Sequence, residues 1–461
     1  MVDSTVVQKI IKAYDIRGLV DGELTEEFAF SAGVAFARFL EISREPATVI
    51  IGEDMRPSSA DLATAFADGI NSQSFDVIRI GLASTDQLYF ASGSKNLPGA
   101  MFTASHNPAE YNGIKLCLSG ARPVGQESGL AWIKNEILKG AALPLRTVGK
   151  VHQIDLLQDY VDFLFSLFPE DTFTHQFQGR RIKVAIDAGN GMGGHTAPAV
   201  MAKISADVTS LYFELNGSFP NHEANPIDPK NVVELQQLVI QSGADIGLAF
   251  DGDADRCFLV DERGELVSPS ALTALIADRE LKKNPGAAII HNLICSRAVP
   301  EVITENGGVP VRSRVGHSYI KQLMAEKSAV FGGEHSGHFY FKDFWRADSG
   351  MLAALHAIAA LLDSQKNLSE LLNKYNRYFL SGEINTKVQD QAGAIERIKK
   401  HYKAGNEEVT FDELDGLTVS AKNWWFNVRP SNTEPLLRLN VEADTSAQME
   451  QLKASVLQLM R

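Results

Sequence analysis

One local pattern recurs along this chain and restricts the folds open to it: an apolar strand, a polar turn, an amphipathic helix and a second apolar strand. The pattern occupies residues 48–81, 182–213 and 287–316. Such alternation is typical of βαβ units, whose strands are buried on both faces of a sheet. Because a single core rarely grows beyond roughly 250–300 residues, we expect three similar α/β domains with mixed sheets.

The pattern changes after about residue 380. Strands are expected near residues 382–388, 417–430 and 436–443, and helices over residues 392–403 and at the end of the chain. This order of elements predicts a smaller α+β domain. With boundaries placed in turn-rich or polar stretches, the expected domains are residues 1–150, 151–264, 265–378 and 379–461.

Charge and cysteine content disfavour several classes of function. The chain carries 57 acidic and 44 basic residues, and its net charge of −13 would repel nucleic-acid phosphates. Its three widely spaced cysteines suggest neither a disulfide framework nor a zinc cluster. No signal-peptide pattern opens the sequence, and the most apolar stretch, residues 350–362, is too short to span a bilayer. We expect a cytoplasmic monomer or homodimer that contacts neither nucleic acid nor membrane.

The most specific segment is DGDADR at residues 251–256, directly after the apolar strand ADIGLAF. Its carboxylates, Asp251, Asp253 and Asp255, would raise one another's pKa if they converged without a counter-charge. A hard cation bound through oxygen resolves this repulsion, and Mg²⁺ is the usual choice beside phosphate. An EF-hand is disfavoured, because Arg256 stands where its loop needs glycine and a strand follows. The remaining alternative is an acidic surface turn.

A second segment, PGAMFTASHNP, ends an apolar strand in a turn that contains Ser105 and His106. A serine at a strand end beside a histidine can act as a nucleophile, although the GxSxG elbow of esterases is absent. The competing interpretation is a hydrogen-bonding turn residue, since Asn107 and Pro108 favour a turn by themselves. Lys115, just beyond, either neutralises phosphate or accepts a proton, or is simply solvated surface.

Two further loops are rich in side chains that bind ligands. In GGEHSGH, an extended backbone would place Glu334, Ser336 and His338 on one side, where they suit the vicinal hydroxyls of a sugar. The loop RPSNTEP combines Arg429 with hydroxyls, an amide and backbone N–H groups, a donor set suited to a phosphate dianion. Each loop also fits an ordinary polar turn with a structural role.

In this order, the segments KAYDIRG, TASHNPAEYNGIK, DGDADR, VGHS, GGEHSGH and RPSNTEP resemble the motifs of the α-D-phosphohexomutases over essentially the whole chain. The resemblance implies a heart-shaped enzyme of four domains with its active site in a central cleft. It implies an isomerase that moves a phosphoryl group between positions 1 and 6 of a hexose phosphate. The implied cofactors are Mg²⁺ and a hexose 1,6-bisphosphate, which is both intermediate and activator.

The resemblance also assigns roles to the residues that match the family's motifs. Ser105 would carry the phosphoryl group and bind Mg²⁺ together with Asp251, Asp253 and Asp255. Around the transfer site, the expected catalytic residues are Ser105, His106, Lys115 and Arg256, with Lys115 favoured over His106 as general base. The sugar and its second phosphate would be bound by Tyr14, Arg17, His317, Glu334, Ser336, His338, Arg429, Ser431, Asn432 and Thr433.

The identity of the hexose is less constrained. GGEHSGH is similar to the phosphomannomutase and phosphoglucomutase group, and Ile294 stands where members that use both sugars have a lysine, which favours mannose phosphate. Glucose phosphate, use of both sugars and glucosamine phosphate stay open, because mannose and glucose differ only in the hydroxyl at C2. From other classes, the alternatives are a non-catalytic sugar-phosphate binder and a Ca²⁺-binding structural protein.

Overall fold

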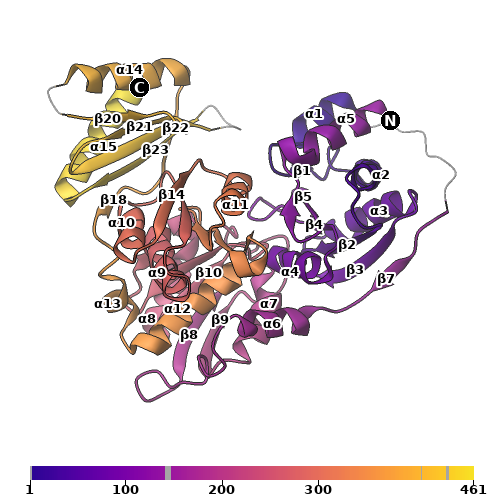
Figure 1. Ribbon diagram of the computed structural model, residues 1–461, viewed down its shortest axis with the longest axis horizontal. Helices are drawn as coiled ribbons and strands as arrows, with labels where there is room; N and C mark the ends of the chain where they lie inside the picture. The colour runs from indigo at the N-terminus through magenta and orange to yellow at the C-terminus, as the bar shows by residue number, and fades with distance from the viewer. Residues whose placement is uncertain (1–2, 141–146, 406–407, 432–435) are drawn as a thin grey trace.

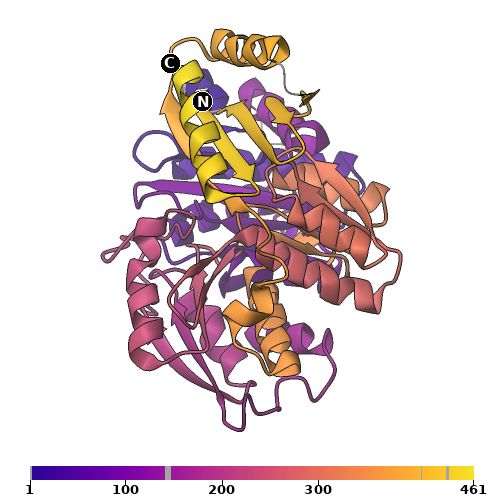
Figure 2. The ribbon, with the colours of Figure 1, turned by 90° about the vertical axis from the view of Figure 1, so that its left-hand side faces the viewer.

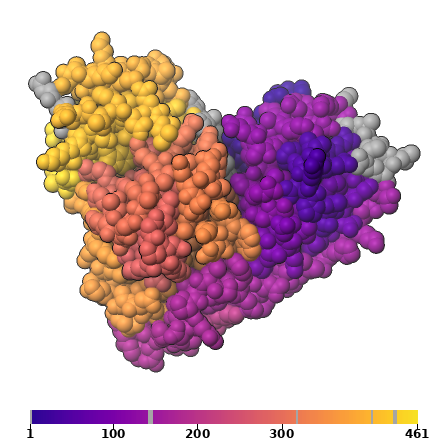
Figure 3. All heavy atoms as spheres, viewed as in Figure 1, coloured from indigo at the N-terminus to yellow at the C-terminus, as the bar shows by residue number. Residues whose placement is uncertain are grey.

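The computed structural model describes residues 3–140, 147–405, 408–431 and 436–461, which form four units in sequence order (Figure 1). Each unit is built on its own β-sheet. The first three units are α/β, and the fourth is a smaller α+β unit, as the sequence predicted. The space-filling outline is heart-shaped, with a notch between the first and fourth units (Figure 3). Within the described ranges, no helix is both long and apolar enough to cross a membrane.

The first unit has a mixed sheet in the order β1-β5-β4-β2-β3-β7, with β6 paired to β5. β2 runs parallel to β3 and β4, whereas β5 runs antiparallel to β1, β4 and β6. The strands are β1 Ile16–Leu19, β2 Thr48–Glu53, β3 Asp76–Leu82, β4 Gly99–Phe102, β5 Tyr111–Leu118, β6 Arg122–Pro123 and β7 Val151–Gln153. The helices are α1 Ser4–Ile10, α2 Glu26–Ile42, α3 Ser59–Asn71, α4 Thr85–Lys95, η1 Gln126–Leu130 and α5 Ala131–Lys139.

The second unit has the sheet order β12-β11-β10-β8-β9. β8 runs parallel to β9 and β10, and β10 and β11 form an antiparallel hairpin whose turn is the acidic segment 251–256. The strands are β8 Ile182–Asp187, β9 Ala206–Leu211, β10 Ile246–Phe250, β11 Cys257–Asp261 and β12 Leu266–Val267. The helices are α6 Leu157–Ser166, α7 Gly193–Met201, η2 Pro229–Val232 and α8 Val233–Ser242.

The third unit has the sheet order β14-β13-β15-β16-β17, parallel over its first three strands and antiparallel after them. The strands are β13 Ala288–Asn292, β14 Val309–Ser313, β15 Phe331–Gly333, β16 Phe339–Phe341 and β17 Ala347–Asp348. The helices are α9 Pro269–Lys283, α10 Ala298–Glu305, α11 His317–Glu326, η3 Lys342–Phe344, α12 Gly350–Ser364 and α13 Leu368–Leu372.

The fourth unit is an antiparallel sheet in the order β18-β23-β22-β21-β20, with β19 also paired to β23. The strands are β18 Phe379–Leu380, β19 Ile384–Lys387, β20 Thr410–Asp412, β21 Leu417–Ser420, β22 Trp424–Pro430 and β23 Leu436–Ala443. Helices α14 Gln391–Ala404 and α15 Ser446–Met460 pack against it (Figure 2).

Two short edge strands pair across the expected domain boundaries. β7 pairs in parallel with β3, so the first unit extends past the expected boundary at residue 150. β12 pairs with β11, so the second unit extends past residue 264. Strands of three and two residues carry no hydrophobic periodicity, because a period of two residues needs at least about four to be recognised.

The cores hold the first three units together and leave the fourth with a core of its own. One face of the first sheet packs on α2, α3 and α5. The other face contributes Ile50, Met101 and Cys117 to a cluster that continues through the second and third units. The fourth unit encloses a separate cluster around Phe426 and Leu439. Because parallel strands direct their carboxyl ends to one edge of a sheet, the loops after β4, β10 and β15 are the natural positions for a shared site.

Candidate active site

Three loops from three different units meet in the interior of the molecule. The loop between β4 and β5 contributes Ser105, and the turn between β10 and β11 contributes the acidic residues. The loop between β15 and β16 contributes His338, whose backbone forms a bridge with Arg256 of the acidic turn. Segments that lie more than 200 residues apart therefore share one buried region.

The Ser105 hydroxyl lies directly against the acidic turn. It donates a hydrogen bond to Asp251 Oδ2 at 2.7 Å, and it lies 3.1 Å from His106 Nδ1 and 3.4 Å from Arg256 Nη2. The backbone of Ser105 has a left-handed φ of +50°, a conformation that costs free energy in a non-glycine residue. Only 5% of its surface is exposed.

Glycine at position 252 makes this approach possible. A Cβ atom there would lie 2.2 Å from the carbonyl oxygen of Ser105, far closer than a van der Waals contact allows. The turn also contains Ala254 with a φ of +60°. The sequence DGDADR therefore supplies both the charge of this turn and the small residue that admits the serine loop.

The three acidic side chains fit a hard divalent cation. Asp251, Asp253 and Asp255 are buried, and their candidate ligand oxygens lie within 4.8 Å of one another. One carboxylate oxygen of Asp253 and one of Asp255 are buried without a hydrogen-bond partner. Orphaned anionic oxygens of this kind are costly unless a cation or a proton accompanies them, and oxygen donors are the ligands that Mg²⁺ prefers.

Lys115 provides a positive charge in the same place. Its ammonium lies 2.6 Å from Asp253 Oδ2 and 2.6 Å from Asp255 Oδ2. Burial alone would lower the pKa of Lys115, but these two carboxylates outweigh it and hold the pKa well above its ordinary value. These contacts favour the protonated ammonium, and the assignment of Lys115 as general base stays a prediction.

The acidic residues titrate differently because their partners differ. Burial raises the pKa of Asp251 to about 7 although Arg256 opposes the shift, and the neighbouring carboxylates add to it. For Asp253, the effect of burial is outweighed by Lys115 and by a hydrogen bond of 2.5 Å from Thr85 Oγ1, which hold its pKa below the ordinary value. The pKa values of these two buried carboxyl groups thus differ, because only Asp253 contacts the ammonium of Lys115.

Arg256 and His106 both lie beside the Ser105 hydroxyl, and they differ in charge. Arg256 donates from Nε to Asp251 Oδ2 at 2.9 Å and from Nη2 to His106 Nδ1 at 2.5 Å. Burial, together with the positive charges of Arg256 and Arg17, holds the pKa of His106 well below its ordinary value. His106 is therefore neutral and, because Nδ1 accepts from Arg256, its proton resides on Nε2.

The loop after β15 presents the expected sugar-type side chains. Glu334 is 2% exposed and accepts a hydrogen bond from the Tyr340 hydroxyl at 2.7 Å. Ser336 Oγ lies 2.9 Å from His338 Nδ1. On its other side, His338 Nε2 lies 3.6 Å from Asp255 Oδ1. The loop that was expected to bind a sugar is thereby in contact with the acidic turn.

Residues near the amino terminus flank the serine loop. Arg17 in β1 donates to Asn107 Oδ1 at 2.6 Å and pairs with Asp15 at 2.5 Å. Tyr14 packs edge-to-face on Tyr319 of α11, with ring centroids 6.3 Å apart. Burial and this neighbour raise the pKa of Tyr14 to about 12.

The remaining expected ligands are described only in part. The backbone of His317 begins α11. Arg429 in β22 is 9% exposed and donates to Glu383 Oε2 at 2.7 Å, and Ser431 follows it with its backbone N–H bonded to the carbonyl of Leu436. Asn432 and Thr433 lie outside the described residues.

Sequence reasoning missed the residue that holds the serine loop. The guanidinium of Arg56, at the N-terminal side of α3, donates to the carbonyl oxygens of Ser105 at 2.9 Å, Asn107 at 2.6 Å and Pro108 at 2.8 Å, and also to that of Tyr111 at 3.0 Å. The side chains of Arg56 and its partner Asp54 are fully buried. The available signal was an arginine directly after a buried strand, GEDMR, which reads equally well as surface.

A second missed group secures the acidic turn from the first unit. The N-terminal turn of α4 places Thr85, whose backbone N–H donates to the carbonyl of Asp253 at 3.0 Å in addition to its hydroxyl contact. The next residue, Asp86, accepts from Tyr160 of the second unit at 2.7 Å and from Ser349 of the third at 2.6 Å. One helix start therefore ties three units together beside the site.

Comparison with known proteins agrees with this architecture over the whole chain. Three families described as phosphoglucomutase/phosphomannomutase, alpha/beta/alpha domains I, II and III, match residues 8–143, 158–264 and 268–378. The corresponding C-terminal domain family matches residues 383–459. The four matches follow the four units in order.

Individual proteins of similar sequence and structure extend the comparison. A phosphomannomutase from Escherichia coli K12 is 38% identical over 441 residues, which cover 94% of each chain. One from Methanocaldococcus jannaschii is 36% identical over 445 residues, or 96% of this chain and 95% of that protein. The crystal structure of a phosphoglucomutase/phosphomannomutase family protein from Burkholderia thailandensis aligns with a TM-score of 0.87 at 28% identity, over 100% of this chain and 97% of the other.

Proposed function

This chain belongs to the phosphoglucomutase/phosphomannomutase family, and we propose that it interconverts mannose 6-phosphate and mannose 1-phosphate through a phosphoserine at position 105. The observation that carries the proposal is the 2.7 Å contact between the Ser105 hydroxyl and Asp251 of the acidic turn. It joins a hydroxyl nucleophile to a candidate cation site. The choice of mannose is supported by relatives named phosphomannomutase that span nearly the whole chain.

The proposed chemistry depends on positioning and on neutralising charge. In the first half-reaction the bond between phosphorus and Ser105 Oγ breaks, and a bond forms from phosphorus to the free hydroxyl oxygen of the hexose monophosphate. That hydroxyl loses its proton, and Ser105 Oγ gains one. Such transfers need little covalent help from the protein, so in-line placement and electrostatic stabilisation dominate the rate.

Cations of the chain surround the position where charge develops. Arg256 Nη2 lies 3.4 Å from Ser105 Oγ and the ammonium of Lys115 lies among the acidic residues. When bound, Mg²⁺ would be held by Asp251, Asp253, Asp255 and the phosphoserine, and would withdraw charge from the transferring group. This concentration of positive charge is local, because the chain as a whole carries a net charge of −13.

The second half-reaction requires the sugar to turn around. The first transfer yields mannose 1,6-bisphosphate, whose other phosphate must reach the same serine. We propose that Glu334 and Ser336 hold sugar hydroxyls and that Arg429 of the fourth unit binds the phosphate that does not react. Because the fourth unit has its own core, we propose that it is the part that accommodates both orientations.

The three cysteines are buried and unpaired, which suits a reducing compartment, and we propose a cytoplasmic location.

A comparison of sugars tests the identity of the substrate most sharply. Purified enzyme, activated with Mg²⁺ and a trace of hexose 1,6-bisphosphate, is assayed on mannose 1-phosphate, glucose 1-phosphate and glucosamine 1-phosphate at equal concentration. We expect the highest kcat/KM on mannose 1-phosphate.

A control variant tests the proposed reaction independently of the choice of sugar. Ser105→Ala should abolish turnover of all three sugars, because no other hydroxyl among the described residues is shown in contact with Asp251. A higher kcat/KM on glucose 1-phosphate would overturn the choice of sugar and leave the mutase reaction standing. Undiminished turnover by Ser105→Ala would overturn the reaction as proposed.

A further inference from the structure

A buried lysine and aspartate lie directly behind the candidate site and have no part in the chemistry described so far. Lys321 of α11 is 4% exposed and Asp348 of β17 is 3% exposed. The ammonium of Lys321 lies 2.7 Å from Asp348 Oδ1. A buried ion pair of this kind is seldom a source of stability, because desolvation of both charges offsets their attraction. Its presence beside the site therefore points to a role in arranging other groups.

The pair faces His338 through the second oxygen of Asp348. Asp348 Oδ2 lies 3.9 Å from His338 Nε2, and the same nitrogen lies 3.6 Å from Asp255 Oδ1. The imidazole thus lies between a carboxylate of the acidic turn and a carboxylate of β17. Because the ammonium of Lys321 lies against Oδ1 of Asp348, it fixes the orientation of the carboxylate and hence the direction of Oδ2.

Aromatic rings determine where the ammonium can sit. It lies 4.1 Å from the ring centroid of Tyr89 in α4 and 5.8 Å from that of Tyr340 in β16. Tyr340 in turn stacks on His338, with an interplanar angle of 19°, and donates its hydroxyl to Glu334 at 2.7 Å. The pair therefore lies beside His338 and reaches Glu334 through Tyr340.

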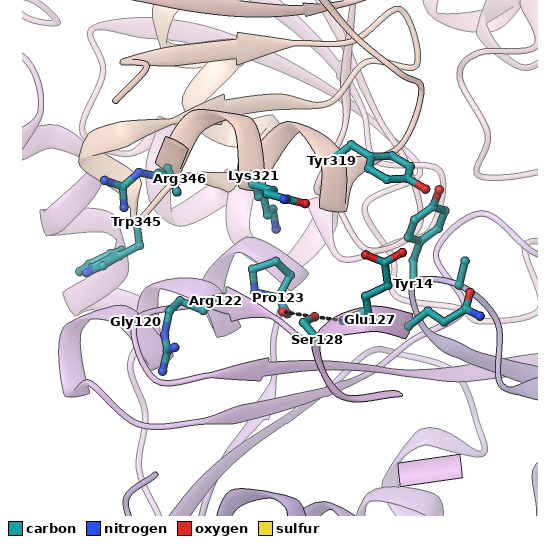
Figure 4. A pocket seen from close by; sticks show the side chains of 15 residues that line it. Tyr14, Gly120, Arg122, Pro123, Glu127, Ser128, Tyr319, Lys321, Trp345 and Arg346 are labelled. Atoms are coloured by element: carbon teal, nitrogen blue, oxygen red, sulfur yellow. Dashed lines mark hydrogen bonds between the residues drawn. The ribbon is translucent and has the colours of Figure 1, made fainter. Parts of the chain in front are cut away.

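Lys321 also spans the boundary between two units. Tyr89 belongs to the first unit, whereas Asp348 and Tyr340 belong to the third. The lysine forms part of the wall of a cavity of about 390 Å³ between η1 and α11, which Tyr319 and Trp345 also line (Figure 4). The ion pair itself lies within the third unit, and the Tyr89 ring adds a contact from the first.

We propose that Lys321 and Asp348 are positioning residues, which hold the imidazole of His338 between the acidic turn and the sugar-binding loop. The proposal rests on the proposed function for its effect on turnover, but the placement of the imidazole does not depend on it. Loss of either residue leaves His338 present but free to rotate away from Asp255. Because such supporting contacts typically affect activity by about 10-fold to 100-fold, the effect is measurable.

A second metal ion is the competing interpretation of the same residues. Asp255, His338 and Asp348 offer ligand atoms within 4.8 Å of one another. The ammonium of Lys321, however, already supplies a positive charge at 2.7 Å from Asp348. Because this ammonium already balances the charge of Asp348, an oriented imidazole accounts for these residues without a second ion.

The test compares Asp348→Asn, which keeps the shape of the side chain, with Lys321→Met and with the double variant, whose pair is neutral. We expect each to lower kcat by about 10-fold to 100-fold and to change KM by less than about threefold. Combining Asp348→Asn with His338→Gln should lower kcat no further than His338→Gln alone, because both changes act through one imidazole. Lys374→Met is the matched control, since its ammonium also lies 2.7 Å from an aspartate but is half exposed and remote from the site. It should leave kcat within about twofold.

A readout without substrate separates this proposal from the proposed function. The ¹⁵N signals of the His338 imidazole, identified by their loss in His338→Gln, should move in Asp348→Asn and in Lys321→Met and stay in place in Lys374→Met. Imidazole signals that do not move would overturn the proposal. So would a double variant, Asp348→Asn with His338→Gln, whose drop in kcat equals the product of the two single drops. Binding of a second divalent cation per chain, abolished by Asp348→Asn, would replace it with a metal site. An inactive wild-type enzyme with the expected shifts would refute only the function.

Discussion

Replacing Arg56 by lysine should loosen the serine loop while keeping the buried charge. The guanidinium donates to four backbone carbonyl oxygens at 2.6–3.0 Å and to Asp54 at 3.2 Å. An ammonium has three donors on a single nitrogen, so at least two of these contacts are lost. With roughly 1.5 kcal/mol for each hydrogen bond that involves a charge, Arg56→Lys should lower the free energy of unfolding by about 3 kcal/mol.

The same change should reduce turnover. The carbonyl of Ser105 is one of the four acceptors, so its loss allows the hydroxyl to move relative to Asp251. Displacements of about 1 Å typically cost on the order of 10²-fold in rate. Urea denaturation gives the stability, and steady-state kinetics on mannose 1-phosphate give kcat and KM.

The chain offers a matched control for Arg56→Lys. Arg263 repeats the local geometry, with its backbone N–H donating to Asp261 Oδ1 at 3.0 Å and Nε donating to Asp261 Oδ2 at 3.2 Å, but its side chain is 63% exposed. Arg263→Lys should leave both the midpoint of urea denaturation and kcat unaltered, because a substitution on the surface has little effect on stability. Equal effects of the two substitutions, or wild-type turnover by Arg56→Lys, would refute the reasoning that the buried guanidinium of Arg56 positions the serine loop.

Three further changes have outcomes that the structure determines. Gly252→Ala adds a Cβ 2.2 Å from the carbonyl oxygen of Ser105, so it should separate the two loops and lower kcat by at least about 10²-fold, without unfolding the protein in a thermal melt. Asp86→Asn should stabilise the protein at neutral pH. Burial raises the pKa of Asp86 to about 6 from 3.8, so the folded state binds more protons and wild-type stability falls by about 3 kcal/mol as pH rises from 4 to 6. The difference between variant and wild-type melting temperatures should therefore grow over this interval and level off above it, and a constant difference would contradict this. Removing divalent cations with a chelator should abolish turnover, Mg²⁺ should restore it, and Asp253→Asn should prevent the restoration; metal-independent turnover would contradict the cation site.

Much of the fold follows from local patterns in the sequence. The helix expected between the two strands of residues 48–81 is α3, Ser59–Asn71, and that expected over residues 392–403 is α14, Gln391–Ala404. Both have amphipathic faces of sufficient length. The short edge strands β7 and β12 were not predicted, because their pairing depends on neighbouring strands and not on their own sequences.

The candidate site could be predicted where its reactive residues are adjacent in the sequence. DGDADR and the serine turn indicated a cation and a hydroxyl, and the structure brings Ser105 and Asp251 together across 146 positions. The protonation of Lys115 could not be predicted, because it depends on carboxylates from another unit. The same holds for Arg56, whose acceptors are backbone carbonyls that no sequence pattern identifies. The catalytic roles of these residues stay predictions until they are measured.

The transfer of phosphate through Ser105 is tested most directly by following that residue during a single turnover. Enzyme phosphorylated by hexose 1,6-bisphosphate is mixed with mannose 1-phosphate in less than molar equivalence, quenched, digested and examined by mass spectrometry. We predict that phosphate on the peptide containing Ser105 falls as mannose 1,6-bisphosphate forms, in equal amounts. Formation of the product by a chain whose Ser105 never carries phosphate would contradict the account.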